Sequence, residues 1–173
     1  APVLTWKNNT LRLDIGFELR YYRGDHFGEV SNFSNEELQP VFGNNWYKYY
    51  QYIGSKTSFT GFFHLLYTLT DNLKLIGDLQ YQEHRWELKQ KLIGHANGYN
   101  LSAPWNFINP RLGVIYDLND NIAVFANYGK SQKEPADNQI IKADDVWSEP
   151  TIASAEVIDN YEMGFSFISG AIN

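Results

Sequence analysis

The chain has 173 residues and a formal charge of −6; 43% of its residues are hydrophobic and 16% are aromatic. This length allows one medium domain or a piece of a larger protein. No apolar run approaches the roughly 18 residues of a membrane-spanning helix, which excludes an α-helical membrane protein but leaves a β-barrel open. The absence of cysteine excludes disulfide frameworks and thiolate zinc sites, and the acidic balance without a basic cluster argues against nucleic-acid binding.

Strict alternation of apolar and polar residues is the strongest local pattern. Between Thr10 and Tyr22 the odd positions are apolar or aromatic, and the even positions are mostly charged. Successive side chains point to opposite faces only in a strand, so this segment is predicted to be a strand with one apolar face. The same period recurs in 57–69, 73–81, 111–118, 122–128 and 161–167, and 3–6 is expected to end an earlier strand.

Short turns and long connections alternate between these predicted strands. Asn- and Asp-rich turns are predicted at 7–9, 70–72 and 119–121, and long loops at 23–56, 89–106 and 129–160. All the short turns then lie at one end of the sheet, as in outer-membrane barrels with short periplasmic turns and long extracellular loops. Tyrosines near both ends of the apolar face fit the aromatic rings found at the two membrane interfaces.

The predicted fold class is therefore all-β: an antiparallel up-and-down transmembrane β-barrel, to which this chain contributes about six or seven strands. A few apolar residues fall on the inner face predicted to be polar, namely Phe62, Leu66, Ile76, Ile115 and Phe125. They argue against an open, water-filled pore, and in a large barrel they could pack against an internal plug.

Short motifs, mostly in the second half of the chain, resemble those of TonB-dependent outer-membrane receptors. Residues 109–116 are similar to the "P-x-x-G-x-x-Y" strand of that family, and Lys133-Glu134-Pro135 resembles its Arg/Lys-Glu-Pro signature. Residues 155–165 resemble "P-E-x-x-x-x-Y-E-x-G", with Ala155 at the position where the family usually has proline. The resemblance implies that residues 1–173 are part of a single outer-membrane β-barrel domain, an internal fragment whose plug domain and remaining strands are not in this chain.

The same resemblance implies a function and a location. The expected protein is a TonB-dependent receptor or transporter in the bacterial cell outer membrane that takes up a scarce nutrient. The expected cargo is an iron–siderophore chelate, with cobalamin, haem or glycans as alternatives. Its expected partners are outer-membrane lipid and lipopolysaccharide, the nutrient chelate, and the TonB complex through a plug not in this chain; no nucleic acid is expected. Two readings from other classes stay open: a passive porin-type channel and an extracellular carbohydrate-binding β-sandwich.

No enzyme is expected, because no motif places a nucleophile, a base or a metal, and accordingly no catalytic residue, metal ligand or cofactor is assigned. Ligand contacts are expected in the three long loops, since binding groups concentrate in loops on a rigid scaffold. Trp46, Trp105 and Trp147 are the candidate ligand-binding residues, acting by stacking or apolar contact. The acidic stretch 131–159 is interpreted as an outer surface facing lipopolysaccharide and its divalent cations, or as a mouth for a cationic ligand.

Overall fold

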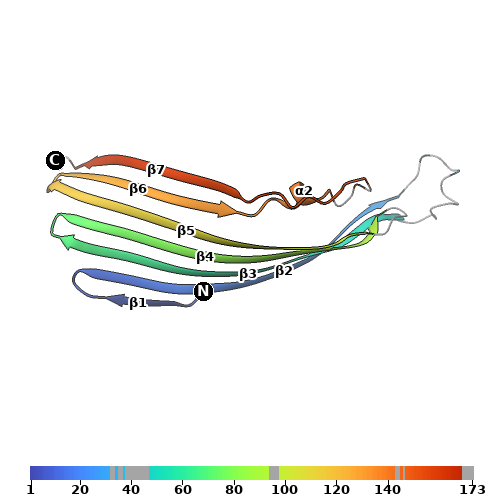
Figure 1. Cartoon of the computed structure of the whole chain (residues 1–173), viewed down its shortest axis with the longest axis horizontal. Helices are drawn as coiled ribbons and strands as arrows, with labels where there is room; N and C mark the ends of the chain where they lie inside the picture. The colour runs from blue at the N-terminus through green and yellow to red at the C-terminus, as the bar shows by residue number, and fades with distance from the viewer. Residues whose placement is uncertain are drawn as a thin grey trace.

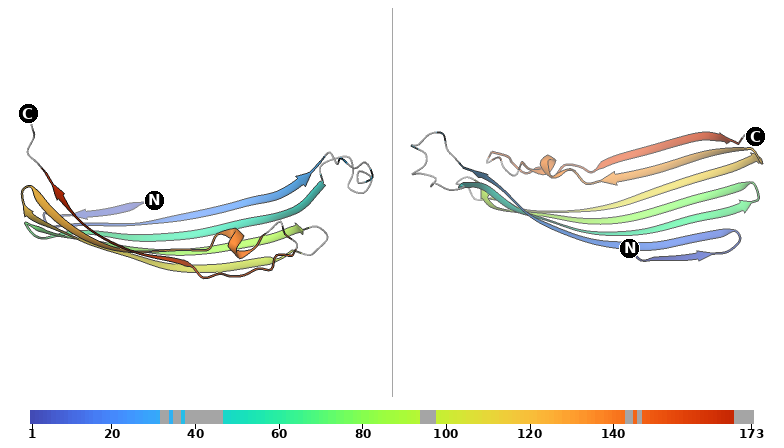
Figure 2. Two further views of the ribbon diagram at one scale, coloured as in Figure 1. Left: turned by 90° about the horizontal axis from the view of Figure 1, so that it is seen from above. Right: turned by 180° about the vertical axis from the view of Figure 1, so that it is seen from behind.

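The computed structural model describes residues 1–31, 34, 37, 47–93, 98–142, 145 and 147–168. In this part of the chain a single antiparallel sheet joins seven strands in the order of the sequence (Figure 1). The strands are β1 (Val3–Lys7), β2 (Leu11–Val30), β3 (Tyr47–Thr70), β4 (Leu73–Ile93), β5 (Asn100–Asn119), β6 (Ile122–Lys133) and β7 (Glu156–Phe167). The sheet is curved and not closed between β1 and β7, and it has the shape of a trough (Figure 2). The prediction of an antiparallel up-and-down sheet, here a partial barrel, is confirmed.

The three short turns are where the sequence predicts them. The ends of the flanking strands leave connections at 8–10, 71–72 and 120–121. Asparagine side chains hold two of these turns: Asn8 Oδ1 accepts the backbone N–H of Leu11 at 2.8 Å, and Asn119 Oδ1 accepts that of Asn121 at 2.9 Å. Asparagine favours such turns because its short side chain bonds the backbone two or three residues on.

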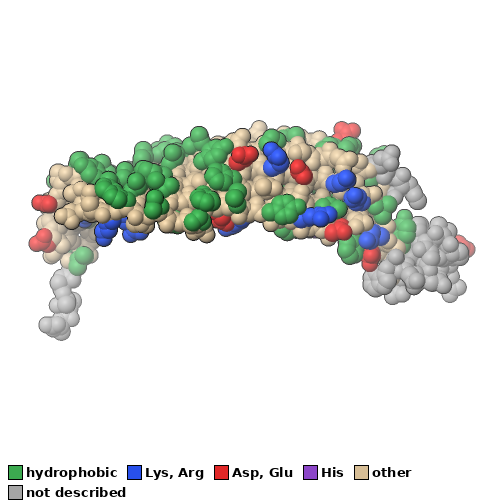
Figure 3. Space-filling view, turned by 90° about the horizontal axis from the view of Figure 1, so that it is seen from below, with side chains coloured by type: hydrophobic (Ala, Val, Ile, Leu, Met, Phe, Trp, Pro, Cys, Tyr) green, Lys and Arg blue, Asp and Glu red, His purple; other side chains and the backbone are tan. Residues whose placement is uncertain are grey.

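The convex outer face is apolar over the half of the sheet next to the short turns. Cross-strand pairing aligns Leu13 of β2 with Leu65 of β3, and Leu75 of β4 with Val114 of β5, all on this face. Hydrophobic side chains gather over this half, and charged side chains lie mostly toward the other end (Figure 3). We call this half the membrane zone; it comprises 11–21, 57–69, 73–81, 108–118, 122–128 and 161–167. An apolar belt facing outward is what a barrel strand presents to lipid.

Glycines on the concave face, here called the inner wall, explain where two of its apolar residues pack. A Cβ on Gly16 would lie 2.4 Å from the ring of Phe62, its cross-strand neighbour, and a Cβ on Gly164 would lie 2.6 Å from the ring of Phe125. Each phenylalanine therefore covers a neighbouring glycine within the sheet.

The strands continue far beyond the membrane zone. β2 has 20 residues and β3 has 24, whereas crossing a bilayer takes about 9–11 residues per strand. The predicted long loops at 23–56, 89–106 and 129–160 are therefore wrong in their bounds. The strands leave only 31–46, 94–99 and 134–155 as connections.

The polarity of the sheet reverses in this extension, here called the upper zone. On β4 the outward side chains become charged, at Glu83, Arg85 and Glu87, while the inward ones become apolar, at Trp86 and Leu88. Trp86 and Leu88 are 4% and 3% exposed. The outward apolar alternation thus stops while the strand goes on, which is why the sequence pattern placed the loops too early. The described residues contain no helix long and apolar enough to cross a membrane.

Candidate ligand site on the inner wall

Strand β6 leaves β5 at the upper edge of the membrane zone. Its ladder with β5 ends at Gly129, which pairs with Arg111, whereas its ladder with β7 continues to Lys133. Pro110 lies at this point of β5, where no β6 residue pairs with it, and proline has no N–H to offer a ladder. The described residues between 130 and 159 (130–142, 145 and 147–159), here called the arm, are therefore free to follow a different path from the rest of the sheet.

Side-chain amides replace the lost ladder at the point of divergence. Asn109 is 6% exposed; its Oδ1 accepts the backbone N–H of Gln132 at 2.8 Å, and its Nδ2 donates to Gln82 Oε1 at 3.1 Å. The Gln132 side chain accepts the backbone N–H of Ile108 at 3.3 Å. These bonds satisfy polar groups that would otherwise be buried without partners, and they fix where the arm begins.

The arm leans over the inner wall and is held there by Glu134. Its Oε2 lies 2.8 Å from Nδ1 of His84 on β4, and its Oε1 forms an ion pair with the ammonium group of Lys56 on β3. Glu134 thus reaches two strands that are not neighbours of β6 in the sheet. The sheet is curved, and the chain after β6 lies on its concave side (Figure 2).

An apolar contact adds to this charged one. The short helix α2 (Asp137–Ile140) and the residue after it place Ile140 and Ile141 against the inner wall. The two side chains are 2% and 4% exposed. They complete a buried cluster whose other members are Trp86, Leu88, Ala103, Trp105 and Phe107. The upper zone therefore has a hydrophobic core on its inner side, and the arm is part of it.

A polar hollow of about 360 Å³ lies on the inner wall beside this contact. It is lined by Glu18, Arg20, Tyr22, Lys56, Ser58, Thr60, Gln80, Gln82 and His84, from β2, β3 and β4. Hydroxyl, amide, imidazole and cationic groups thus converge on one volume. Arg20 forms an ion pair with Glu18, and Lys56 is shared with Glu134 at the boundary with the arm. We call this cavity the upper hollow.

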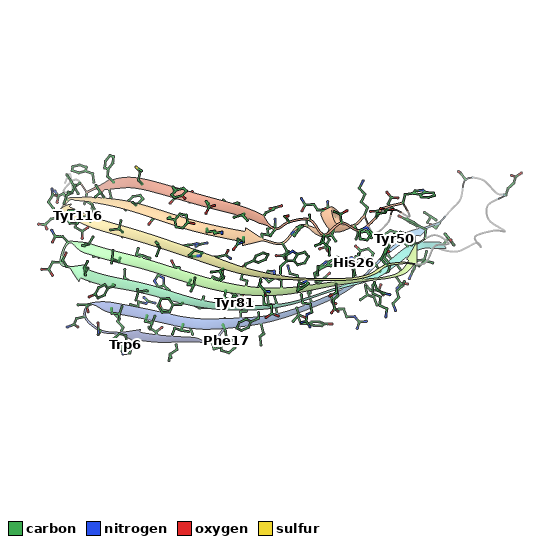
Figure 4. The ribbon with its side chains drawn as sticks, in the orientation of Figure 1. Trp6, Phe17, His26, Tyr50, Tyr81 and Tyr116 are labelled. Atoms are coloured by element: carbon green, nitrogen blue, oxygen red, sulfur yellow. The ribbon has the colours of Figure 1, made fainter. Side chains whose placement is uncertain are left out.

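Aromatic rings continue the inner wall from the hollow toward the extracellular end. The rings of His26 and Tyr52 are stacked with centroids 4.8 Å apart, and Tyr50 stacks on Tyr52 at 6.1 Å. The Tyr22 hydroxyl lies 3.3 Å from Nε2 of His26, and the two side chains meet over Gly24, where a Cβ would clash with both. His26 and Tyr50 lie together near the extracellular end, away from Trp6 and Tyr116 at the short-turn end (Figure 4). Such rings provide flat contact surfaces next to hydrogen-bonding groups.

Burial and charge shift two titratable groups at this boundary. Burial, and secondarily the positive charge of Lys56, lower the pKa of His84. Burial also lowers the pKa of Lys56, opposed by the negative charge of Asp137. The lowered pKa of His84 favours a neutral imidazole at neutral pH, beside a carboxylate that is paired with Lys56.

A second hollow, of about 460 Å³, reaches from the membrane zone to the base of the arm. It is bordered by Asp78, Arg111, Asn127 and Glu162 among others. Asp78 Oδ1 lies 2.6 Å from Nδ1 of His64, also on the inner wall. Arg111 is exposed and forms no ion pair with any residue in the described part of the chain. This lower wall is polar, as expected for the inside of a barrel.

Of the three predicted tryptophans the structure describes two, and it does not bring these two together. Trp46 lies outside the described residues. Trp105 lies on β5, not in a loop, and is packed at 9% exposure within the buried cluster, so its placement in a ligand-binding loop is wrong. Trp147 lies in the arm and is 89% exposed, so it is open to contact.

Sequence reasoning missed the residues that line the upper hollow. Arg20, Ser58, Gln82 and His84 all occupy inward positions of their strands, and the alternation of each strand could have identified them. Among the described residues, no group of histidine, aspartate and glutamate side chains could hold a metal ion.

The curved antiparallel sheet, apolar outside and polar inside over one zone, defines the class: an outer-membrane β-barrel. A comparison with protein-family models matches residues 3–173 to "TonB dependent receptor-like, beta-barrel". The chain belongs to this family, whose members lie in the outer membrane of Gram-negative bacteria, and this is its location.

Two solved structures share the fold. The ferric yersiniabactin uptake receptor FyuA from Yersinia pestis matches with a TM-score of 0.68 and 14% identity, over 96% of this chain and 25% of that chain. The Ferric-Catecholate import receptor Fiu from E. coli K12 matches with a TM-score of 0.53 and 14% identity, over 77% of this chain and 24% of that chain. The present chain thus spans about a quarter of the length of each receptor. The search of curated proteins gives no match.

Proposed function

We propose that this chain is part of the barrel domain of a TonB-dependent receptor that takes up an iron–siderophore chelate. The observation that carries the proposal is the upper hollow, which lies on the inner wall across the upper edge of the membrane zone, on the side from which a ligand outside the cell arrives. Its hydroxyl, amide and cationic groups, next to the stacked His26, Tyr52 and Tyr50, suit a polar ligand with flat rings. The two similar structures are receptors for ferric yersiniabactin and for ferric catecholates, which supports this cargo.

The rest of the proposed receptor follows from the family. A plug domain and the remaining strands, outside this chain, would complete the barrel, and the plug would meet the TonB complex. The carbohydrate-binding β-sandwich is excluded, because the family is a barrel and the described residues form one sheet, not two packed layers. A passive channel differs from the proposed receptor in needing no energy, and the uptake experiment below separates the two.

Lipopolysaccharide is the proposed lipid partner. Arg23, Arg85, Lys89 and Lys91 are exposed in the upper zone, and none has an ion-pair partner within the described ranges. Of these, Arg23, Arg85 and Lys89 lie on the outer face. Such cations, just beyond Tyr21 and Tyr81 at the interface, can contact the phosphates of the outer leaflet.

The test is uptake by iron-starved cells that carry the full-length receptor or a deletion. A panel of radiolabelled ferric chelates should include one whose accumulation needs both the receptor and an energised inner membrane. Accumulation that survives removal of the proton gradient would indicate a passive channel. Failure of every ferric chelate in the panel would remove iron as the cargo.

A further inference from the structure

The contact between Glu134 and the upper hollow places a carboxylate from the chain itself in a site built for a ligand. Lys56 and His84 line the hollow, and the same two side chains hold Glu134. The hollow therefore has an anion-binding position, and the arm fills it.

We propose that an anionic group on the incoming ligand competes with Glu134 for Lys56 and His84, and that this competition releases the arm from the inner wall. The proposal rests on the proposed function, because it takes the upper hollow to be the ligand site. It adds the chemical class of the competing ligand group, which is a carboxylate or comparable anion. It also adds a conformational consequence, the release of the arm.

The arm is built to move as a unit. At its base, β6 and β7 remain paired up to Lys133 and Glu156. Within it, Thr151 donates its backbone N–H to the carbonyl of Ile140 at 2.8 Å, and Lys142 donates its own to Ser148 Oγ at 3.0 Å. Beyond the bonds of Gln132 at its base, the described part of the arm is docked on the inner wall by Glu134 and by an apolar contact of Ile140 and Ile141, next to which Ala155 packs. Loss of the Glu134 contact leaves the arm internally bonded but less firmly docked.

Competition gives the required coupling. A ligand shifts a conformational equilibrium only by its difference in affinity for the two states. An anion can occupy the position between Lys56 and His84 only when Glu134 has left it, so such an anion binds the undocked state alone. The other charges around this position are the Glu18–Arg20 ion pair on β2 and Asp137 on α2, whose negative charge acts on Lys56.

The experiment uses the full-length receptor in lipid nanodiscs and tricarballylate, a tricarboxylate, as the probe, with its neutral triethyl ester as the control ligand. Calorimetry should show that Glu134→Gln binds tricarballylate about tenfold more tightly than the unmodified receptor, because the internal competitor has lost its charge. The double variant Glu134→Gln, Lys56→Gln should lose this gain. Glu156→Gln removes only an exposed ion pair with Lys133 and should bind like the unmodified receptor.

Release of the arm is measured separately by pulsed electron paramagnetic resonance. Spin labels at Glu149→Cys and Ser102→Cys occupy exposed positions on the arm and on β5, in a chain that has no cysteine of its own. Tricarballylate and Glu134→Gln should each lower the docked fraction, and the ester should not.

Weaker or unchanged tricarballylate binding by Glu134→Gln would overturn the proposal, as would a docked fraction that does not respond to the probe. Both readouts are independent of iron uptake. If both readouts fail while ferric-chelate uptake is normal, the competition alone is rejected. If no ferric chelate is taken up while the competition is observed, the proposed cargo is rejected.

Discussion

Glu134 and His84 are 50 positions apart in the chain, yet Oε2 of Glu134 lies 2.8 Å from Nδ1 of His84. This contact joins the Arg/Lys-Glu-Pro-like motif after β6 to the inner wall of β4. It fixes the arm over the upper hollow, and it makes the docking of the arm sensitive to the protonation of His84.

Lowering the pH from about 7.5 to about 5.5 is expected to undock the arm. In the docked state burial, and secondarily the charge of Lys56, lower the pKa of His84. When the arm leaves, the burial is relieved while Lys56 stays, so the pKa rises part of the way toward its ordinary value of about 6.5 and the undocked state binds the proton more readily. The docked state is therefore most stable above that ordinary value and loses stability as the pH falls below it.

The spin-label pair at 149 and 102 measures this pH response directly. His84→Asn keeps a side-chain donor for Glu134 but cannot titrate, so its docked fraction should stay constant over the same range. An equal pH response in His84→Asn would show that another group is responsible.

Charge introduced on the outer face of the membrane zone should be far more costly than charge on the inner wall. Leu13→Arg or Val114→Arg should lower the free energy of unfolding by about 2–4 kcal/mol, because each places a cation in lipid. Thr60→Arg faces the upper hollow and should cost much less. Unfolding of the full-length receptor in phospholipid vesicles gives the values, and equal costs at both sets of positions would refute the assignment of faces.

Asn109→Ala should destabilise the sheet at the upper edge of the membrane zone and loosen the base of the arm. The substitution removes the bonds to Gln132 and Gln82 at a position that is 6% exposed, and leaving buried groups unsatisfied costs about 1–3 kcal/mol. Hydrogen exchange at the backbone amide of Gln132 should rise. Asn100→Ala, at the exposed start of β5, is the matched control and should have no effect.

The tryptophans Trp105 and Trp147 should respond differently to replacement by alanine. Trp105→Ala removes a buried ring from the cluster under the arm and should cost about 3–5 kcal/mol. Trp147→Ala should leave stability unchanged, since its side chain is 89% exposed, and should weaken ligand binding. Thermal unfolding and ligand titration on the same two variants separate these effects; normal binding by Trp147→Ala would limit the ligand contacts to the inner wall and other parts of the receptor.

The strands of the membrane zone could be predicted from the sequence, because there one face meets lipid and the other does not. Apolar residues at every second position, such as Leu11, Leu13 and Ile15, indicate which face of the strand meets lipid. In the upper zone water lies on the outer face and the arm covers the inner one, so the pattern changes phase. A strand whose apolar residues move from outward to inward positions, as on β4, no longer matches a single alternating template.

The candidate site was less predictable, because it depends on contacts across the curvature of the sheet. Glu134 could be singled out as part of a motif, but its contact with Lys56 requires that β6 diverge from β5 and bend over two strands. Choosing Trp105 as a loop residue failed for a related reason: the cluster that buries it includes Ile140 and Ile141, which local patterning on β5 cannot reveal.

The central claim is that the ligand binds the upper hollow on the inner wall. The test is to titrate the full-length receptor with the ferric chelate that the uptake experiment identifies. The titration compares variants at nearby positions of the same strands, some facing inward and some outward. Arg20→Ala and Gln82→Ala change the upper hollow, whereas Arg23→Ala and Glu83→Ala change the outer face. We expect each inner substitution to weaken binding about tenfold or more, equivalent to roughly 1.4 kcal/mol, and each outer one to leave the Kd unchanged. Unchanged affinity in both inner variants, or an equal loss in the outer pair, would contradict the account.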